Sequence, residues 1–160
     1  MADNSCLEQI LENVVKVDFV PLDTCKGILY LIPKLTSVSG SGITFGSSAL
    51  TLAMDGTGDG DMDASPSLST TDKDAVYGRI HQHTLQCVVT DGFDDVRKKV
   101  DHIENIDLVP LFTMRDGGQK VLFPLPNTCV LTAAESYGDL THTMNVELVM
   151  SSYSRIISVE

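Results

Sequence analysis

Apolar side chains recur with a helical period between residues 94 and 106. The spacings between them are four, three and three residues, which places them on one face of an α-helix. These positions are Val96, Val100, Ile103 and Ile106. Charged residues, including Arg97 and Asp101, fall on the opposite face. The pattern predicts one amphipathic helix over residues 92–106 that packs against a sheet.

Two short apolar stretches follow this helix and predict a tight β-hairpin. Leu108–Met114 and residues 119–123 are the expected strands, and Asp116, Gly117 and Gly118 lie between them. Glycine tolerates the positive φ that tight hairpin turns require. The hairpin therefore shows how the domain is built, although it carries no obvious chemistry.

Alternation of apolar and polar residues indicates strands in much of the remaining chain. It is clearest over residues 75–89 and 141–151, where every second residue lies on the same face. Shorter strands are expected over residues 28–33, 48–54, 130–134 and 156–159. Strands joined mainly by turns favour an antiparallel arrangement. We therefore expect an α+β, mainly β fold: an antiparallel sandwich or barrel of about eight strands with one packed helix and a short N-terminal helix.

The N-terminal helix is expected over residues 5–17. A serine followed three residues later by a glutamate gives the stretch the spacing of a capping box. Leu7, Ile10 and Leu11 contribute to a continuous apolar face behind it. Such a helix docks either on its own domain or on a neighbouring subunit. Leu7, Ile10 and Leu11 are therefore candidate subunit contacts.

A length of 160 residues predicts one domain over residues 1–160. Within it, residues 55–74 are rich in Gly, Ser and Asp and almost free of large apolar side chains. They are expected to form a long, acidic, flexible loop, and loops of this length are commonly functional or disordered. The loop could order against a neighbouring subunit. Asp59, Asp61 and Asp63 are therefore further candidate contacts.

The formal net charge is −11, which argues against binding to a nucleic-acid backbone. The one basic run, residues 97–99, is short and flanked by aspartates. An acidic protein is compatible with a channel through which DNA slides, because acidic groups repel phosphates. We accordingly expect no sequence-specific contact with DNA.

The four cysteines are expected to be reduced thiols. No pair of them has C-x-x-C spacing, and no signal peptide precedes them: Cys6, Cys25, Cys87 and Cys129. No apolar run reaches the length that spans a bilayer, so no membrane partner is expected.

Aspartates recur between residues 55 and 63 in a pattern that resembles a calcium-binding loop. The weak candidate ligands are Asp55, Asp59, Asp61 and Asp63. In an EF-hand, a glutamate at the twelfth position closes the coordination shell. Counted from Asp55, that position is Pro66, which has no carboxylate. A solvated acidic loop is the better interpretation, and we expect no metal and no cofactor.

Other candidate chemistry is sparse. His81 and His83 lie two apart on a predicted strand and face the same way, a spacing that can place two ligands on one metal. No carboxylate or cysteine lies next to them, which favours ordinary polar roles. The chain has no G-x-S-x-G elbow, no phosphate-binding P-loop and no dinucleotide fingerprint. We therefore expect no enzyme and no catalytic residue.

The order of these segments resembles a family. The run of residues 27–33, Gly-Ile-Leu-Tyr-Leu-Ile-Pro, then residues 71–89, then the helix and the Asp-Gly hairpin, is similar to small structural proteins of Bacteroidetes phages and prophages, including crAss-like phages. The resemblance covers roughly residues 27–151 and is best over residues 27–33 and 108–123. It rests on pattern rather than on an invariant motif.

The resemblance implies a structural role without catalytic residues. Proteins of this family look like tail-tube or head-to-tail ring components, so it implies a homo-oligomeric ring or tube that surrounds a DNA channel in the virion. Other tail or connector proteins would be its partners. The alternative is a β-sandwich ligand-binding or adhesion module, in which the acidic loop could hold calcium.

Overall fold

The computed structural model describes residues 7–10, 14–26, 44–54, 56–64, 66–75, 78–138, 141–152 and 156–159. The strands are β1 Leu7–Ile10, β2 Val14–Pro21, β3 Leu50–Ala53, β4 Gly60–Met62, β5 Ser67–Ala75, β6 Gly78–Asp91, β7 Leu108–Met114, β8 Gln119–Val121, β9 Val130–Tyr137, β10 His142–Ser152 and β11 Ile157–Val159. A short 3-10 helix, η1, covers Leu22–Thr24, and α1 covers Phe93–Ile103. The expected mainly β fold with one packed helix is confirmed.

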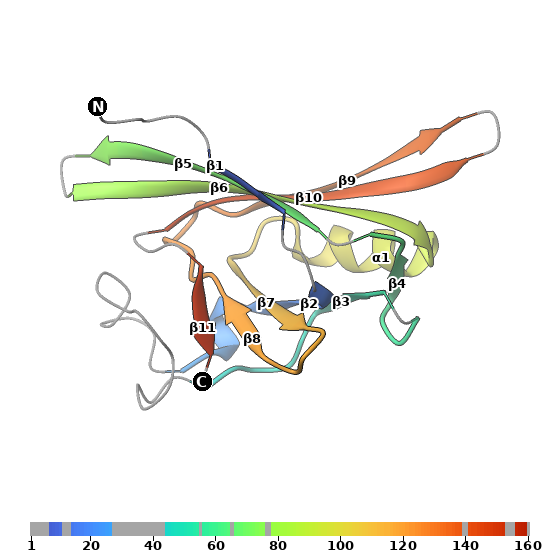
Figure 1. The fold of residues 1–160 in the computed structure, drawn as a ribbon, viewed down its shortest axis with the longest axis horizontal. Coiled ribbons are helices and arrows are strands. Elements are labelled where there is room, and N and C mark those ends of the chain that lie inside the picture. The colour runs from blue at the N-terminus through green and yellow to red at the C-terminus, as the bar shows by residue number, and fades with distance from the viewer. Residues whose placement is uncertain are drawn as a thin grey trace.

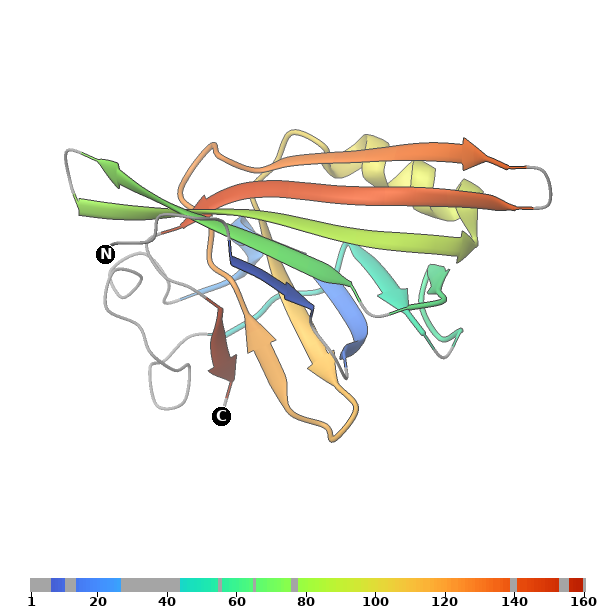
Figure 2. The same ribbon diagram turned by 45° about the horizontal axis from the view of Figure 1, so that its top comes forward.

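The strands form two layers joined at β4 (Figures 1 and 2). The first layer has the strand order β1-β5-β6-β10-β9, and every neighbouring pair in it is antiparallel. The second has the order β3-β2-β7-β8-β11, also antiparallel. Strand β4 pairs parallel with β3 and antiparallel with β6. The eleven strands therefore form one continuous sheet that folds over itself as a sandwich and does not close into a barrel.

The main core lies between the two layers. Every second side chain of β10 points into it and is buried: Met144, Val146, Leu148 and Met150. The apolar face of α1 closes one end of this core through Val96, Val100 and Ile103. Burial of side chains of this kind stabilises a fold by roughly 1.5–3 kcal/mol each. The apolar spacing that predicts the helix from the sequence is therefore the spacing of the side chains that α1 buries in this core.

A second apolar cluster contains residues of β2, β7, β8 and β11. Its buried members are Val20, Val109, Leu111, Val121, Phe123 and Ile157. The ring of Phe45 stacks on that of Phe123, with centroids 6.2 Å apart. The first five residues of β7 are all buried, because alternate side chains enter the two clusters. This explains why β7 is continuously apolar, as strands buried on both faces are.

The predicted N-terminal helix is wrong where the structure describes it. Leu7–Ile10 is the edge strand β1, and Val14–Pro21 is β2, which lies between β3 and β7. An irregularity between Val14 and Lys16 shifts the register of β2, so its apolar spacing imitates a helix. Val14–Pro21 is extended because it is buried between two strands and is rich in β-branched residues.

The prediction of one loop over residues 55–74 is also wrong, because the range contains β4 at Gly60–Met62 and most of β5. Ser67–Ala75 forms β5, which pairs along its whole length with β6. Its outward positions are Ser67, Ser69, Thr71 and Lys73, and its inward Leu68 and Thr70 are buried. Pairing with a long neighbouring strand thus outweighs the absence of large apolar residues. The strand expected over residues 28–33 lies outside the described residues.

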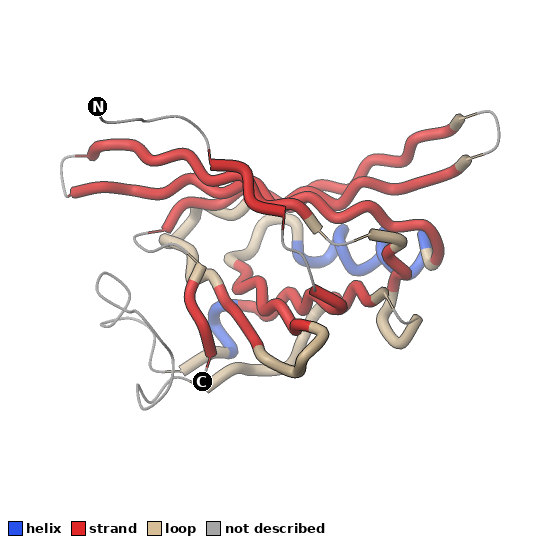
Figure 3. Tube along the Cα trace, in the orientation of Figure 1, coloured by secondary structure: helices blue, strands red, loops and turns tan. Residues whose placement is uncertain are grey.

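Two hairpins extend in opposite directions beyond the second layer. Strands β5 and β6 form one of them, and β9 and β10 form the other (Figures 1 and 3). Strand β6 is fourteen residues long and belongs to the centre of the first layer. The end of β6 leads into α1, which brings the helix N-terminus close to the β9–β10 hairpin.

Candidate functional site

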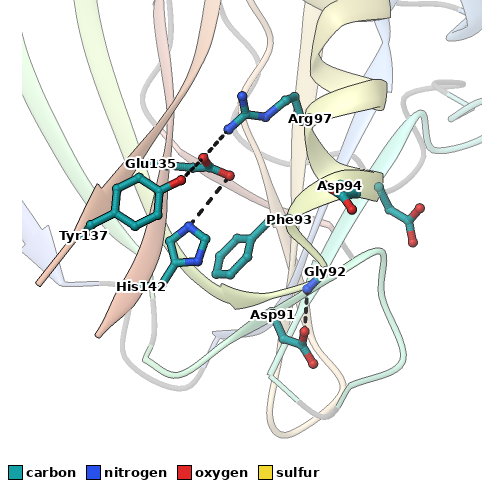
Figure 4. A pocket seen from close by; sticks show the side chains of 9 residues that line it. Asp91, Gly92, Phe93, Asp94, Arg97, Glu135, Tyr137 and His142 are labelled. Carbon is teal, nitrogen blue, oxygen red and sulfur yellow. Dashed lines mark hydrogen bonds and ion pairs between the residues drawn. The ribbon is translucent and has the colours of Figure 1, made fainter. Parts of the chain in front are cut away.

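An open depression of about 780 Å³ lies where α1 begins beside the β9–β10 hairpin (Figure 4). Its residues come from the end of β6, the start of α1 and the paired ends of β9 and β10. They are Asp91, Gly92, Phe93, Asp94, Asp95, Arg97, Glu135, Tyr137 and His142. The depression therefore depends on segments that are about forty residues apart in the chain and meet only in the folded protein.

Gly92 sets the direction of the chain at this site. Its φ is 79°, and a Cβ placed there would lie 2.4 Å from the carbonyl oxygen of Asp59. Only glycine fits this left-handed conformation without displacing the neighbouring backbone. The amide of Gly92 donates to Oδ1 of Asp91, at 2.8 Å. This turn starts α1 at Phe93, whose ring faces the hairpin.

Three rings form a stack along one wall of the depression. The centroids of Phe93 and His142 lie 4.2 Å apart with the rings tilted by 34°. The centroids of His142 and Tyr137 lie 4.4 Å apart at 18°. Tyr137 is the outermost ring and is 72% exposed. Its position on His142 gives the site an exposed aromatic surface whose orientation is already fixed.

Glu135 connects the wall to α1 (Figure 4). Its Oε2 accepts the hydroxyl of Tyr137 at 2.8 Å and lies 2.6 Å from Nη2 of Arg97. Its Oε1 lies 3.8 Å from Nε2 of His142. The hydrogen bond from Tyr137, followed by the contacts with Arg97, lowers the pKa of Glu135 below its ordinary value. The same hydrogen bond raises the pKa of Tyr137, because ionised Tyr137 would face the carboxylate.

The depression combines aromatic rings with carboxylates. It contains no cysteine, serine, threonine or lysine among the residues that line it. Burial raises the pKa of Cys87 to about 12 and that of Cys129 to about 11, so both remain thiols far above neutral pH. Glu135 is occupied by Arg97 and Tyr137, whereas Asp91, Asp94 and Asp95 are exposed. The site therefore offers an aromatic surface beside excess negative charge.

Asp59, Asp61 and Asp63, which were singled out as possible metal ligands, are not among the residues that line this depression. Asp59 is a structural residue, since Oδ1 lies 2.7 Å from Nζ of Lys99 and Oδ2 accepts the amide of Thr51 at 3.0 Å. Asp61 belongs to β4, and Asp63 is exposed just beyond it. Asp55 lies outside the described residues. In the part of the chain that the structure describes, no three His, Cys, Asp or Glu side chains are grouped so that they could hold a metal ion.

His81 and His83 have separate partners. His83 is buried, with Nδ1 2.9 Å from the hydroxyl of Thr70 and Nε2 2.8 Å from that of Ser152. His81 is paired through Nδ1 with Asp72. Because each ring nitrogen of His83 contacts a hydroxyl within the core, this histidine ties β5, β6 and β10 together.

Two of the three candidate subunit contacts of the N-terminal stretch belong to an edge strand. Leu7 and Ile10 belong to β1, which pairs only with β5 among the described strands, and Leu11 lies outside the described residues. At the opposite side of the first layer, β9 pairs only with β10 among these strands. The first layer therefore has an unpaired edge at each side in the described structure.

The ring stack and its carboxylate were missed by the sequence reasoning. Glu135 and Tyr137 lie just beyond the strand expected over residues 130–134, and Arg97 was assigned to a solvated helix face. One signal was present: the polar residues 136–139 predict a turn between the strands expected over residues 130–134 and 141–151, and extending the first strand through that turn pairs Tyr137 with His142. Their proximity to α1 follows only from the tertiary fold.

Comparison with known proteins identifies no relative: no family model, no curated protein and no solved structure matches the chain. Within the described residues, no helix has the length and apolar character needed to cross a membrane. Function must therefore be argued from the geometry of the chain itself.

Proposed function

We propose that this chain is a structural subunit of a homo-oligomeric ring or tube. The assembly would belong to a phage tail or head-to-tail connector and would surround the DNA channel of the virion. The observation that carries the proposal is the first layer of the fold, which has an unpaired edge strand on each side. Strand edges of this kind add strands from other chains through main-chain hydrogen bonds.

The strand directions favour a head-to-tail assembly. The first layer has five strands and each neighbouring pair is antiparallel, so β1 and β9 run in the same direction. When copies with the same orientation extend the sheet, β9 of one copy pairs parallel with β1 of the next. Such a contact is heterologous, and it gives a closed ring when the rotation between copies closes. Strand β9 offers eight residues and β1 offers four.

The outward face of the first layer is compatible with a channel lining. Among the positions whose side chains the structure describes on β5, β6, β9 and β10, this face carries mostly Ser, Thr, Gln, Asn, Val and Ala, and its charged side chains are Lys73 and Glu147. Oε2 of Glu147 accepts a hydrogen bond from Gln86. A face with almost no cations gives a phosphate backbone little to bind, which suits DNA in transit. The overall charge of −11 acts in the same direction.

Disulfide cross-linking tests the head-to-tail contact. In the full chain, Glu8→Cys places a thiol in β1 and Ala134→Cys places one in β9, and the registers with Ser69 and Asn145 put both positions on the outward face of the first layer. Oxidation of the double variant should give a ladder of covalent oligomers that ends at one ring size, and each single variant should give none of this ladder. Dimers formed by the Ala134→Cys variant alone would instead indicate a two-fold β9–β9 contact. That result, or a strict monomer by light scattering and electron microscopy at high concentration, would contradict the proposal.

The wild-type protein under the same oxidant is the control for its native thiols. Of these, Cys87 is buried, whereas Cys25 and Cys129 are half-buried. A ladder in the wild type would mean that native thiols form the links, and the experiment would then be repeated with Cys25→Ser and Cys129→Ser in every variant.

A second candidate, a β-sandwich ligand-binding module, is favoured by the depression beside α1. The ring stack and the exposed carboxylates at this place are not needed to explain the sheet or its core. Calcium at the acidic loop has less support, because Asp59 is already paired with Lys99. Isothermal calorimetry with calcium tests that part directly, and measurable heat from a wild-type titration that Asp61→Asn removes would restore it.

A further inference from the structure

We propose that the Asp91–Gly92 pair is a site of spontaneous isoaspartate formation in the folded protein. This modification converts the aspartate into its β-linked isomer and requires only water. The inference goes beyond the proposed ring and does not depend on it, because the reaction takes place within one copy of the chain. It rests on the position of the Asp91 carboxylate, which contacts the backbone nitrogen that the reaction uses.

Isoaspartate forms when a backbone nitrogen attacks the side chain of the aspartate that precedes it. Here the nitrogen of Gly92 bonds to Cγ of Asp91. One carboxyl oxygen takes up the amide proton and a proton from solvent and leaves as water. A second water then opens the resulting succinimide ring. Opening at the main-chain carbonyl carbon gives isoaspartate, and opening at Cγ returns aspartate, so the step consumes no oxidant or reductant.

The sequence alone does not single out this pair. The chain has four Asp–Gly pairs, and in each of them the glycine leaves the attacking nitrogen unhindered, because it has no side chain. The structure describes both residues of three pairs: Asp59–Gly60, Asp91–Gly92 and Asp116–Gly117. Asp55, which begins the fourth, lies outside the described residues. The difference between the described pairs is the direction in which each carboxylate and each nitrogen is held.

Asp91 holds its carboxylate against the nitrogen that has to attack it. The amide of Gly92 donates to Oδ1 at 2.8 Å (Figure 4), so the nitrogen lies close to Cγ, to which Oδ1 is bonded. Reacting groups that the fold holds in contact lose less freedom on the way to the transition state. Asp91 is also exposed, so water reaches both the carboxyl group and the succinimide.

The other two described pairs have these groups engaged elsewhere. Both carboxylate oxygens of Asp59 have partners, since Oδ1 lies 2.7 Å from Nζ of Lys99 and Oδ2 accepts the amide of Thr51 at 3.0 Å. At the β7–β8 turn, the nitrogen of Gly117 donates to a main-chain carbonyl at 3.0 Å and not to the carboxylate of Asp116. Folding therefore opposes the reaction at these two aspartates.

Isoaspartate would disturb the start of α1. The isomer carries the Cβ of Asp91 in the main chain, which lengthens the link between β6 and Gly92. The backbone has little room at this point, because a Cβ on Gly92 would lie 2.4 Å from the carbonyl oxygen of Asp59. The ring of Phe93, the next residue, would be displaced from its place 4.2 Å from His142. The modification would thus change the wall of the depression.

The test compares ageing of the full chain in native buffer and in concentrated guanidinium chloride at the same pH and temperature. Electron-transfer fragmentation of the peptides measures isoaspartate at each pair separately. In denaturant, Asp59, Asp91 and Asp116 should react at similar rates, because only the local sequence acts there. In the native protein, Asp91 should react at least several-fold faster than either of the others. Protection of Asp91 by folding as strong as that of Asp59 or Asp116 would overturn the proposal.

Variants assign the effect on the site. Asp91→Glu should stop the reaction, because the longer side chain would have to close a larger ring, and Asp116→Glu is the matched control at the hairpin turn. In aged wild type and in aged Asp116→Glu, the NMR signal of the His142 ring should gain a second component in step with isoaspartate at Asp91. Asp91→Glu should keep a single signal. A second component in that variant as well would contradict the assignment, and unchanged core methyl resonances before ageing confirm that each variant is folded.

Discussion

Nη2 of Arg97 lies 2.6 Å from Oε2 of Glu135, so one ion pair joins the first half of α1 to the end of β9. The hydroxyl of Tyr137 donates to the same oxygen at 2.8 Å. A single carboxylate thus fixes both the helix and the outermost ring of the stack. Its ionisation state should be measurable in the stability of the protein and in the titration of its neighbour.

Replacing Glu135 with glutamine should lower the free energy of unfolding at neutral pH, because Arg97 loses its negative partner. The pKa of Glu135 is lowered in the folded protein, chiefly by the hydrogen bond from Tyr137 and then by Arg97. A carboxylate of this kind stabilises the fold above its unfolded pKa of about 4.3, and the effect is lost as pH falls through the folded value. Urea unfolding should therefore separate the wild type from Glu135→Gln at neutral pH and bring them together in acid.

The control for this experiment is Glu104→Gln, which removes a negative charge from the exposed C-terminal end of α1. It should not reproduce the pH-dependent loss. An equal loss in both variants would mean that net charge, not the contact with Arg97, is responsible.

Tyr137 should ionise at a higher pH than an ordinary tyrosine, because Glu135 accepts its hydrogen bond and repels the phenolate. In Glu135→Gln its pKa should fall back towards about 10. The raised pKa contributes stability that is present below about pH 10 and is lost as pH rises through the folded value. The difference in tyrosinate absorbance between each protein and its Tyr137→Phe counterpart isolates this one ring among the four tyrosines. Identical titration curves with and without Glu135 would contradict the assignment.

Gly92→Ala should destabilise the protein more than an ordinary turn substitution does. The new Cβ would combine a strained φ of 79° with an approach of 2.4 Å to the carbonyl oxygen of Asp59. Strained backbone of this kind costs roughly 1–3 kcal/mol before the clash is counted. Gly117→Ala is the matched control, since φ is 92° there and no atom lies within 4 Å. Thermal unfolding that ranks the two variants in the opposite order would refute this account of the turn.

Leu148→Ala should cost about 2–5 kcal/mol, because the side chain is fully buried in the main core. Val149→Ala, one residue further along β10, should cost roughly 1 kcal/mol or less, since its side chain lies on the outward face. Chemical denaturation of the two variants tests the alternation of β10 directly. Comparable losses would mean that the outward face is covered in solution, for example by another copy.

Helix α1 and the β7–β8 hairpin were predictable because their signals are local. Val96, Val100 and Ile103 mark the buried face of the helix by spacing alone, and Gly117 with φ of 92° occupies the predicted turn. Neither element needs a distant partner to be recognised. In both elements the residues that carry the sequence signal, the apolar spacing of the helix or the glycines of the turn, are the same residues that form the element.

Strands β1, β2 and β5 were not predictable in the same way. The partner strands of β2 are β3 and β7, and β7 begins about ninety residues later in the chain. Strand β5 is rich in serine and threonine, and it is extended because it pairs with β6 along its whole length. The depression was missed for the same physical reason: Arg97, Glu135 and His142 meet only after three elements have packed.

Strand β6 has neighbours on both sides for most of its length: β10 on one side, and β5 followed by β4 on the other. It is thus the strand through which the first layer continues, by way of β4, into the second. When the neighbour on one side of β6 separates from it by local fluctuation, the hydrogen bonds to the neighbour on the other side remain. The amides of β6 should consequently exchange with deuterated solvent only when the whole molecule unfolds, and the slowest exchange should mark this strand as the last part of the chain to lose its structure.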